Sequence, residues 1–72
     1  MKRWNRLMYR AIDDAGAKVV ARKKIGGHFR LTLLLPTGVE RKLVVASSPA
    51  IEEAAAVAVE RDVLRLISSS TA

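Results

Sequence analysis

The chain has 72 residues, no cysteine and a single histidine, and its 13 Lys and Arg outnumber its 7 Asp and Glu, which gives a net charge of +6. This length predicts one small domain, and the composition excludes disulfides, thiolate metal ligands and a structural zinc site. No apolar stretch approaches the roughly 18 residues of a membrane-spanning helix, and the N-terminus lacks the apolar run of a signal peptide. We therefore expect a cytoplasmic protein with no cofactor, no metal and no membrane partner.

The positive charge is concentrated in the first part of the chain. Residues 1–42 carry eleven Lys and Arg against three Asp and Glu, a net charge of +8, whereas residues 43–72 carry two against four, a net charge of −2. Such a one-sided distribution favours an anionic partner, and nucleic acid is the commonest one.

A first helix is predicted from Arg3 to Ala15, because apolar residues recur there at the spacing of a helix that buries one face. The apolar residues are Trp4, Leu7, Met8, Ala11, Ile12 and Ala15. Gly16 is expected to end the helix in a left-handed conformation. The opposite face carries Arg3, Arg6 and Arg10, which we expect to contribute to nucleic-acid binding.

Three strands are predicted at about Lys18–Lys24, His28–Leu35 and Val39–Ala46, separated by turn residues, so they form an antiparallel meander. A two-residue turn at Gly26-Gly27 would place Arg22 opposite Leu31 and mix charge into the apolar face. We therefore predict a three-residue loop. The resulting pairs are Lys24 with His28, Arg22 with Arg30, Ala21 with Leu31, and Val19 with Leu33.

The second turn is predicted as a three-residue loop, Pro36–Gly38, with Gly38 left-handed. It pairs Leu35 with Val39, Leu31 with Leu43, and Phe29 with Val45. The apolar face of the sheet then meets the helices, with Lys23 and Arg41 as exceptions at its margins. The other face, called the open face below, carries Lys18, Arg22, Lys24, His28, Arg30, Thr32 and Lys42. Of these, Lys18, Arg22, Lys24, Arg30 and Lys42 are predicted to bind nucleic acid.

The last helix is predicted to start with Ser48 as N-cap and Pro49 as its first residue and to run to about Ile67. Its buried stripe comprises Ile51, Ala55, Ala56, Val59, Val63, Leu66 and Ile67. Val57 and Leu64 lie outside this stripe, seven residues apart, and could seat a second copy or a partner's helix. We expect a monomer, with one domain over residues 1–67 and a disordered tail over residues 68–72.

The predicted order α-β-β-β-α, a single α+β domain with both helices on one face of a three-stranded meander, resembles the double-stranded-RNA-binding fold and the small HicA-like toxins and phage proteins. The segment Lys24-Ile25-Gly26-Gly27-His28-Phe29 looks like the HicA pattern of basic residue, glycine, small residue and histidine entering the second strand. Ser47-Ser48-Pro49 and the stretch from Arg61 to Arg65 also match small HicA-like proteins. The last helix differs from RNA-binding domains, since Glu52 and Glu53 stand where those domains carry lysines.

The HicA resemblance implies a metal-independent ribonuclease in which His28 is catalytic, with an antitoxin as a partner. Imidazole can accept or donate a proton near neutral pH, and Lys24 and Arg30 would stabilise the charge on the phosphate. No other catalytic motif is present, so an enzymatic activity would depend on His28. The sequence itself predicts a small basic domain that binds RNA or another nucleic acid. The alternative is a phage-type inhibitor that binds an acidic surface of a host protein such as RNA polymerase.

Overall fold

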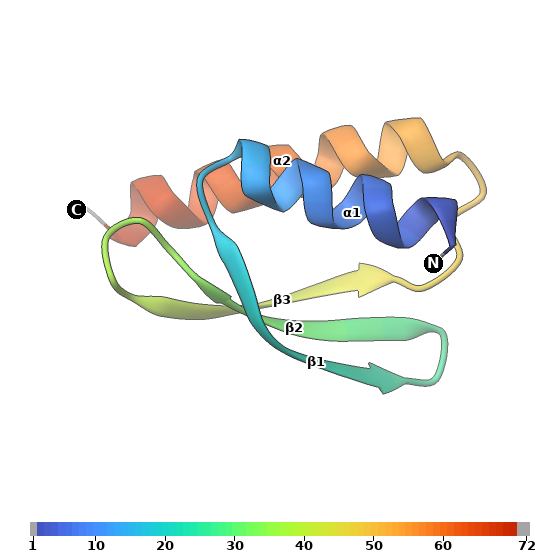
Figure 1. Cartoon of the computed structure of the whole chain (residues 1–72), viewed down its shortest axis with the longest axis horizontal. Coiled ribbons are helices and arrows are strands. Elements are labelled where there is room, and N and C mark those ends of the chain that lie inside the picture. Colours follow the sequence, from blue (N-terminus) through green and yellow to red (C-terminus); the bar gives the residue numbers. More distant parts are fainter. Residues whose placement is uncertain (1, 71–72) are drawn as a thin grey trace.

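The computed structural model describes residues 2–70 and contains two α-helices and one three-stranded antiparallel sheet (Figure 1). In chain order the elements are α1 (Arg3–Asp14), β1 (Lys18–Ile25), β2 (His28–Leu34), β3 (Glu40–Ala46) and α2 (Glu52–Ser70). The strand order is β1-β2-β3, so β2 is central and β1 and β3 form the edges. The predicted α-β-β-β-α arrangement is confirmed.

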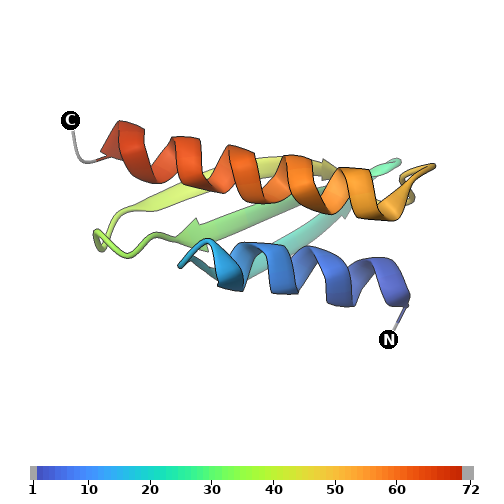
Figure 2. The ribbon, with the colours of Figure 1, turned by 90° about the horizontal axis from the view of Figure 1, so that it is seen from above.

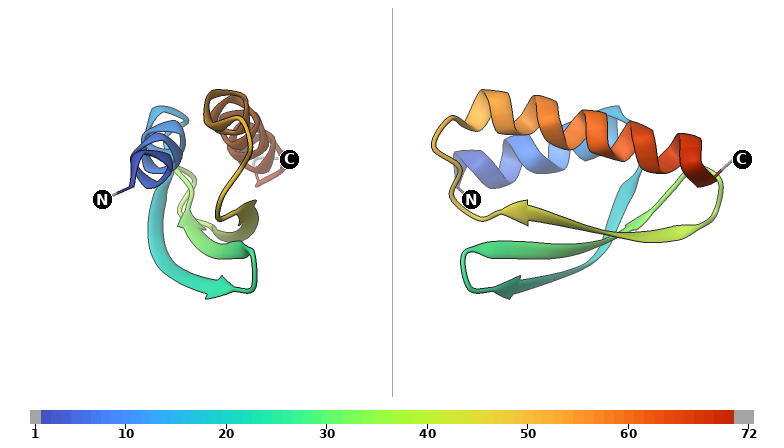
Figure 3. Two further views of the ribbon diagram at one scale, coloured as in Figure 1. Left: turned by 90° about the vertical axis from the view of Figure 1, so that its right-hand side faces the viewer. Right: turned by 180° about the vertical axis from the view of Figure 1, so that it is seen from behind.

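Both helices cover one face of the sheet and leave the other face open (Figure 3). Seen from above, α1 and α2 lie side by side and run in the same direction from one end of the molecule (Figure 2). The turn between β1 and β2 lies at that end, on the side farthest from the helices (Figure 1). The tip of the first hairpin is therefore free of the helical layer.

The C-terminus of α1 has the predicted glycine end. Gly16 has φ = +95°, its N–H bonds to the carbonyl of Asp13 at 2.9 Å, and the N–H of Ala17 bonds to the carbonyl of Ile12 at 3.1 Å. This pair of bonds is the Schellman motif, which satisfies carbonyl groups at the end of the helix and turns the chain towards β1.

The start of α2 lies later than predicted. Its first helical residue is Glu52, and the carbonyl of Ile51 accepts the hydrogen bond from the N–H of Ala55 at 3.0 Å. Ser48 and Pro49 lie instead in the link that rises from β3 to the helical layer. Ile51 ends this link and is 65% exposed, so its assignment to the buried stripe is wrong.

The end of α2 also lies later than predicted. The helix continues to Ser70, whose hydroxyl donates a hydrogen bond to the carbonyl of Ile67 at 2.8 Å. Residues 68–70, which we expected in a disordered tail, are therefore helical. The rest of the expected tail, Thr71 and Ala72, lies outside the described residues.

The second hairpin has the predicted register. Its pairs include Leu31 with Leu43 and Phe29 with Val45. Gly38 has φ = +86°, as expected for a left-handed residue in this loop, and the N–H of Leu35 donates to the carbonyl of Val39 at 2.9 Å.

The first hairpin has a different register from the predicted one. Its turn consists of Gly26 and Gly27, and Ile25 lies opposite His28. A positive φ at Gly26 but not at Gly27 is typical of a type II′ turn. The predicted pairs of Lys24 with His28, Arg22 with Arg30 and Ala21 with Leu31 are wrong. The observed pairs are Lys24 with Phe29, Arg22 with Leu31, and Ala21 with Thr32.

A β-bulge at Val20 restores the predicted register at the start of β1. The register shifts between Val19 and Ala21, so Val19 lies opposite Leu33 as predicted. Bulges bend a strand and increase its twist. Beyond the bulge, β1 turns away from α1 towards the tip of the hairpin (Figure 3).

The core lies between the two helices and the central strand. Its buried residues are Trp4, Met8, Ala11, Ile12, Ala15, Ala17, Phe29, Leu31, Leu33, Leu35, Val45, Val59 and Val63. Leu43, on an edge strand, is only partly buried. The indole N–H of Trp4 donates a hydrogen bond to the carbonyl of Ala46 at 2.9 Å and so ties α1 to the end of β3. Within residues 2–70, no helix is both long and apolar enough to cross a membrane.

Candidate nucleic-acid interface

The chain between α1 and β3 is basic and has no carboxylate side chain. From Ala15 to Val39 it carries five Lys and Arg and no Asp or Glu. We call these five residues, Lys18, Arg22, Lys23, Lys24 and Arg30, the hairpin cations. All five are exposed, and none of them forms an ion pair with a carboxylate of residues 2–70. Their charge is therefore available to a ligand.

The hairpin cations lie on both faces of the sheet, because directly opposite residues share a face. Arg22 and Lys24 pair with buried residues of β2 and so lie on the helix side. Their predicted place on the open face is wrong. Lys18 and Arg30 lie on the open face as predicted, together with Lys23, which we expected on the helix side.

Arg22 lies against two aromatic rings. Its guanidinium carbon is 5.0 Å from the centre of the Phe29 ring and 6.0 Å from the centre of the Tyr9 ring, within cation–π range. The side chain covers the margin of the core where the helices do not reach, while its charge stays in solvent. This arrangement explains why an arginine opposite Leu31 does not disrupt the apolar face.

The open face also carries Lys42 and His28. Lys42 lies there as predicted, opposite Thr32, with the carboxylate of Glu40 two residues away on the same face. The third strand therefore adds less net charge to this face than the first two strands do. The cationic part of the interface is centred on the β1–β2 hairpin.

His28 is exposed at the start of β2. Together with Arg30, Ile25 and Val44 it lines a shallow hollow of about 210 Å³ on the open face. Lys24 lies on the other face of the sheet, so the predicted grouping of His28 between Lys24 and Arg30 is wrong. On the open face, the cation directly opposite Arg30 is Lys23.

Arg3 is engaged by the start of α2. Its guanidinium forms hydrogen-bonded ion pairs with Glu53 and, at 3.2 Å, with Glu52. The pairs form because both helices begin at the same end of the molecule (Figure 2). The hydrogen bond from Arg3 is the main cause that lowers the pKa of the Glu53 carboxyl, and the same bond raises the pKa of Arg3.

The other two arginines of α1 differ from each other. Arg10 has Asp14 at 3.9 Å, one helical turn away. Arg6 is exposed and forms no ion pair among residues 2–70. Of the three arginines predicted to bind nucleic acid from α1, only Arg6 keeps its charge without a nearby carboxylate partner.

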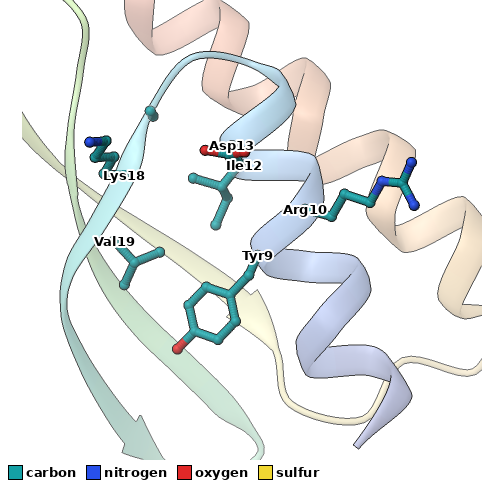
Figure 4. Close-up of a pocket in the computed structure, with 7 residues that line it drawn as sticks. Tyr9, Arg10, Ile12, Asp13, Lys18 and Val19 are labelled. Carbon is teal, nitrogen blue, oxygen red and sulfur yellow. The ribbon is translucent and has the colours of Figure 1, made fainter. Parts of the chain in front are cut away.

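A notch between α1 and β1 was not predicted from the sequence. It has a volume of about 490 Å³ and is lined by Tyr9, Arg10, Ile12, Asp13, Ala17, Lys18 and Val19. Figure 4 shows the Tyr9 ring reaching from α1 towards β1, with Ile12 and Val19 beside it. Tyr9 lies next to the apolar series of α1 rather than in it, and the notch opens only because β1 turns away from the helix.

Val57 and Leu64 lie on the outer side of α2 and are 64% and 48% exposed. Their predicted position outside the buried stripe is confirmed. Their role as a contact for a second copy or for a partner's helix remains a prediction.

Comparison of the chain with protein-family models, with curated proteins and with solved structures finds no match.

Proposed function

We propose that this domain binds nucleic acid, with RNA as the preferred ligand, and that the β1–β2 hairpin is its main contact. The observation that supports the proposal is the acid-free segment from Ala15 to Val39, whose five cations are exposed and have no carboxylate partner among residues 2–70. Phosphate contacts supply most of the affinity of sequence-independent binding, and each contact needs a cation that is not already neutralised.

The position of the hairpin favours the same role. Its tip lies away from the helices (Figure 1), and cations lie on both faces of β1, so phosphates can be met on either side of this edge strand. No Phe, Tyr or Trp side chain lies on the open face among the described residues, because Trp4 and Phe29 are buried and Tyr9 is on α1. We therefore expect the open face to contact the phosphate backbone, with little sequence preference. We also propose a cytoplasmic location for this function.

The test compares two variants with the same net charge. The hairpin variant carries Lys18→Gln, Lys23→Gln and Lys24→Gln, and the control variant carries Arg41→Gln, Arg61→Gln and Arg65→Gln. Binding to a labelled RNA strand and to an RNA duplex is measured by fluorescence anisotropy between about 50 and 200 mM salt. Each phosphate contact contributes about −0.7 to the log–log salt slope for single strands and −0.9 for duplex DNA, so losing three contacts should flatten the slope by about 2–3.

Wild type and control should bind with similar slopes, whereas the hairpin variant should bind more weakly and with a flatter slope. An equal loss in both variants would show that net charge alone attracts RNA, and no binding by the wild type at about 50 mM salt would reject the proposal. A pull-down from host lysate with and without nuclease treatment distinguishes RNA binding from the alternative function, inhibition of a host protein through its acidic surface. A protein partner remains bound after nuclease treatment, whereas an RNA partner is lost.

One observation favours a chemical role for His28 within the same proposal. His28 and Arg30 line one hollow on the open face, so an imidazole and a guanidinium can reach the same phosphate. This arrangement suits a HicA-like ribonuclease, in which the histidine transfers a proton and the arginine stabilises the charge on the phosphate. The His28→Ala variant should then lose RNA cleavage and growth arrest but keep RNA binding. Equal toxicity of this variant would remove the enzyme hypothesis.

A further inference from the structure

The notch between α1 and β1 combines an apolar floor with charged margins. Ile12, Ala17 and Val19 supply the floor, and the partly buried ring of Tyr9 forms one wall (Figure 4). The Tyr9 hydroxyl makes no hydrogen bond to the described residues. The volume of the notch, about 490 Å³, falls in the range of roughly 300–1,000 Å³ that is usual for small-molecule sites.

The charges around the notch point to an anionic ligand with an aromatic ring. The guanidinium of Arg22 lies 6.0 Å from the Tyr9 ring, so one cation stands beside the aromatic wall of the notch. Lys18 also lines the notch, but its ammonium group points away from Tyr9 and Ile12 (Figure 4). The carboxylate of Asp13 also lines the notch and would repel a phosphate placed beside it. The same carboxylate can accept a hydrogen bond from an amino group on a base.

We propose that this notch binds one nucleotide, with its base against Tyr9 and its phosphate on Arg22. In this orientation an exocyclic amino group of the base faces Asp13. The phosphate lies on Arg22, so the next nucleotides of a strand would extend along β1 towards the other hairpin cations. The inference rests on the proposed nucleic-acid function and adds a base site to a phosphate-binding hairpin. A purely apolar side chain of a protein partner would fill the floor of the notch but would leave Arg22 without an anion.

The experiment uses AMP, UMP and ribose 5-phosphate as probes in separate NMR titrations of the whole protein. AMP should shift the Tyr9 ring and Val19 methyl resonances and bind more tightly than ribose 5-phosphate, which has the phosphate but no base. AMP should also bind more tightly than UMP, because uracil has no amino group for Asp13. Tyr9→Leu should weaken AMP binding by about tenfold or more, since base stacking on an aromatic side chain is lost. Tyr9→Phe keeps the ring and should bind AMP like the wild type.

Equal binding of AMP and ribose 5-phosphate, or unchanged AMP binding by Tyr9→Leu, would overturn the base site. The hairpin proposal would survive that result if RNA binding still depended on salt and on the hairpin cations. Conversely, AMP binding that depends on Tyr9 in a protein that does not bind RNA would support the nucleotide site and reject the hairpin proposal. The far-UV circular dichroism spectrum and Tm of Tyr9→Leu are measured in parallel, and values that match those of the wild type exclude a folding defect as the cause of its weaker AMP binding.

Discussion

Buried and exposed side chains alternate along β2, and this alternation leads to a specific prediction about stability. Leu31 has no exposed surface, whereas Leu34, three residues later and on the open face, is 36% exposed. Truncating a buried leucine to alanine costs about 2–5 kcal/mol, because the surrounding core collapses only partly around the cavity. A 72-residue domain has a total stability of about 4–11 kcal/mol. Leu31→Ala should therefore remove a large part of it, and Leu34→Ala should change it by less than about 1 kcal/mol.

The two variants are compared by thermal unfolding, followed by far-UV circular dichroism and by the fluorescence of Trp4, the single tryptophan, which is buried in the core. For a domain of this size, 1 kcal/mol lowers Tm by about 4–8 °C. Leu31→Ala should thus melt at least about 4–8 °C below Leu34→Ala, which corresponds to a difference of about 1 kcal/mol or more. Similar melting of both variants would show that β2 does not turn its odd-numbered residues towards the helices.

The remaining predictions concern the first hairpin, the helix ends and the outer face of α2. Arg22→Ala should destabilise the domain by about 0.5–1 kcal/mol through loss of its ring contacts, and Lys23→Ala should not. A larger destabilisation by Lys23→Ala than by Arg22→Ala would instead favour the three-residue loop at Ile25–Gly27, which places Lys23 on the helix side. Because the Glu53 pKa is lowered from 4.5, its pair with Arg3 stabilises the fold above that pH and is lost as the pH falls through the folded-state value. Wild type and Arg3→Gln should therefore differ in stability at neutral pH and converge in acid, and a difference that persists in acid would contradict this pairing. The mass in solution should be that of a monomer at micromolar concentration; a dimer that Val57→Ser/Leu64→Ser abolishes would identify the outer face of α2 as its contact.

The parts of the fold that sequence predicts are those whose local signals agree with one another. In α1, the apolar spacing and Gly16 both end the helix at the same place, and the structure has that end. In the second hairpin, the loop Pro36–Gly38 and the pairing of Leu31 with Leu43 require the same register. Each of these features depends on residues close in the chain or directly opposite, so the pattern contains the information that the structure needs.

The first hairpin shows what such patterns omit. We expected that placing Arg22 opposite Leu31 would mix charge into the apolar face. The hairpin bends away from the helices (Figure 3), however, and the guanidinium lies on the rings of Phe29 and Tyr9. The bulge at Val20 then resets the alternation, so both a two-residue turn and the pairing of Val19 with Leu33 are satisfied. A periodicity of two without a bulge cannot produce this combination.

The candidate site also has features that the sequence predicts and features that only the folded structure shows. The acid-free run of cations can be read directly from the sequence, whereas the faces on which they lie depend on the register of the first hairpin. Arg3 forms ion pairs with Glu52 and Glu53, so its charge is not available to a ligand. These pairs form because the two helices start side by side, although their first residues are about fifty residues apart in the chain. The notch beside Tyr9 depends on the departure of β1 from α1. These relations arise only in the folded molecule.

The place of the hairpin cations on a free edge also bears on the class of partner. An edge strand exposes unpaired N–H and C=O groups, and lysine side chains along it hinder pairing with a strand of another protein. β1 is such an edge, and four of the five hairpin cations lie on it. A nucleic-acid backbone needs no strand pairing and gains from cations on either side of the edge. The same residues therefore oppose strand addition by a protein partner and favour the approach of phosphates.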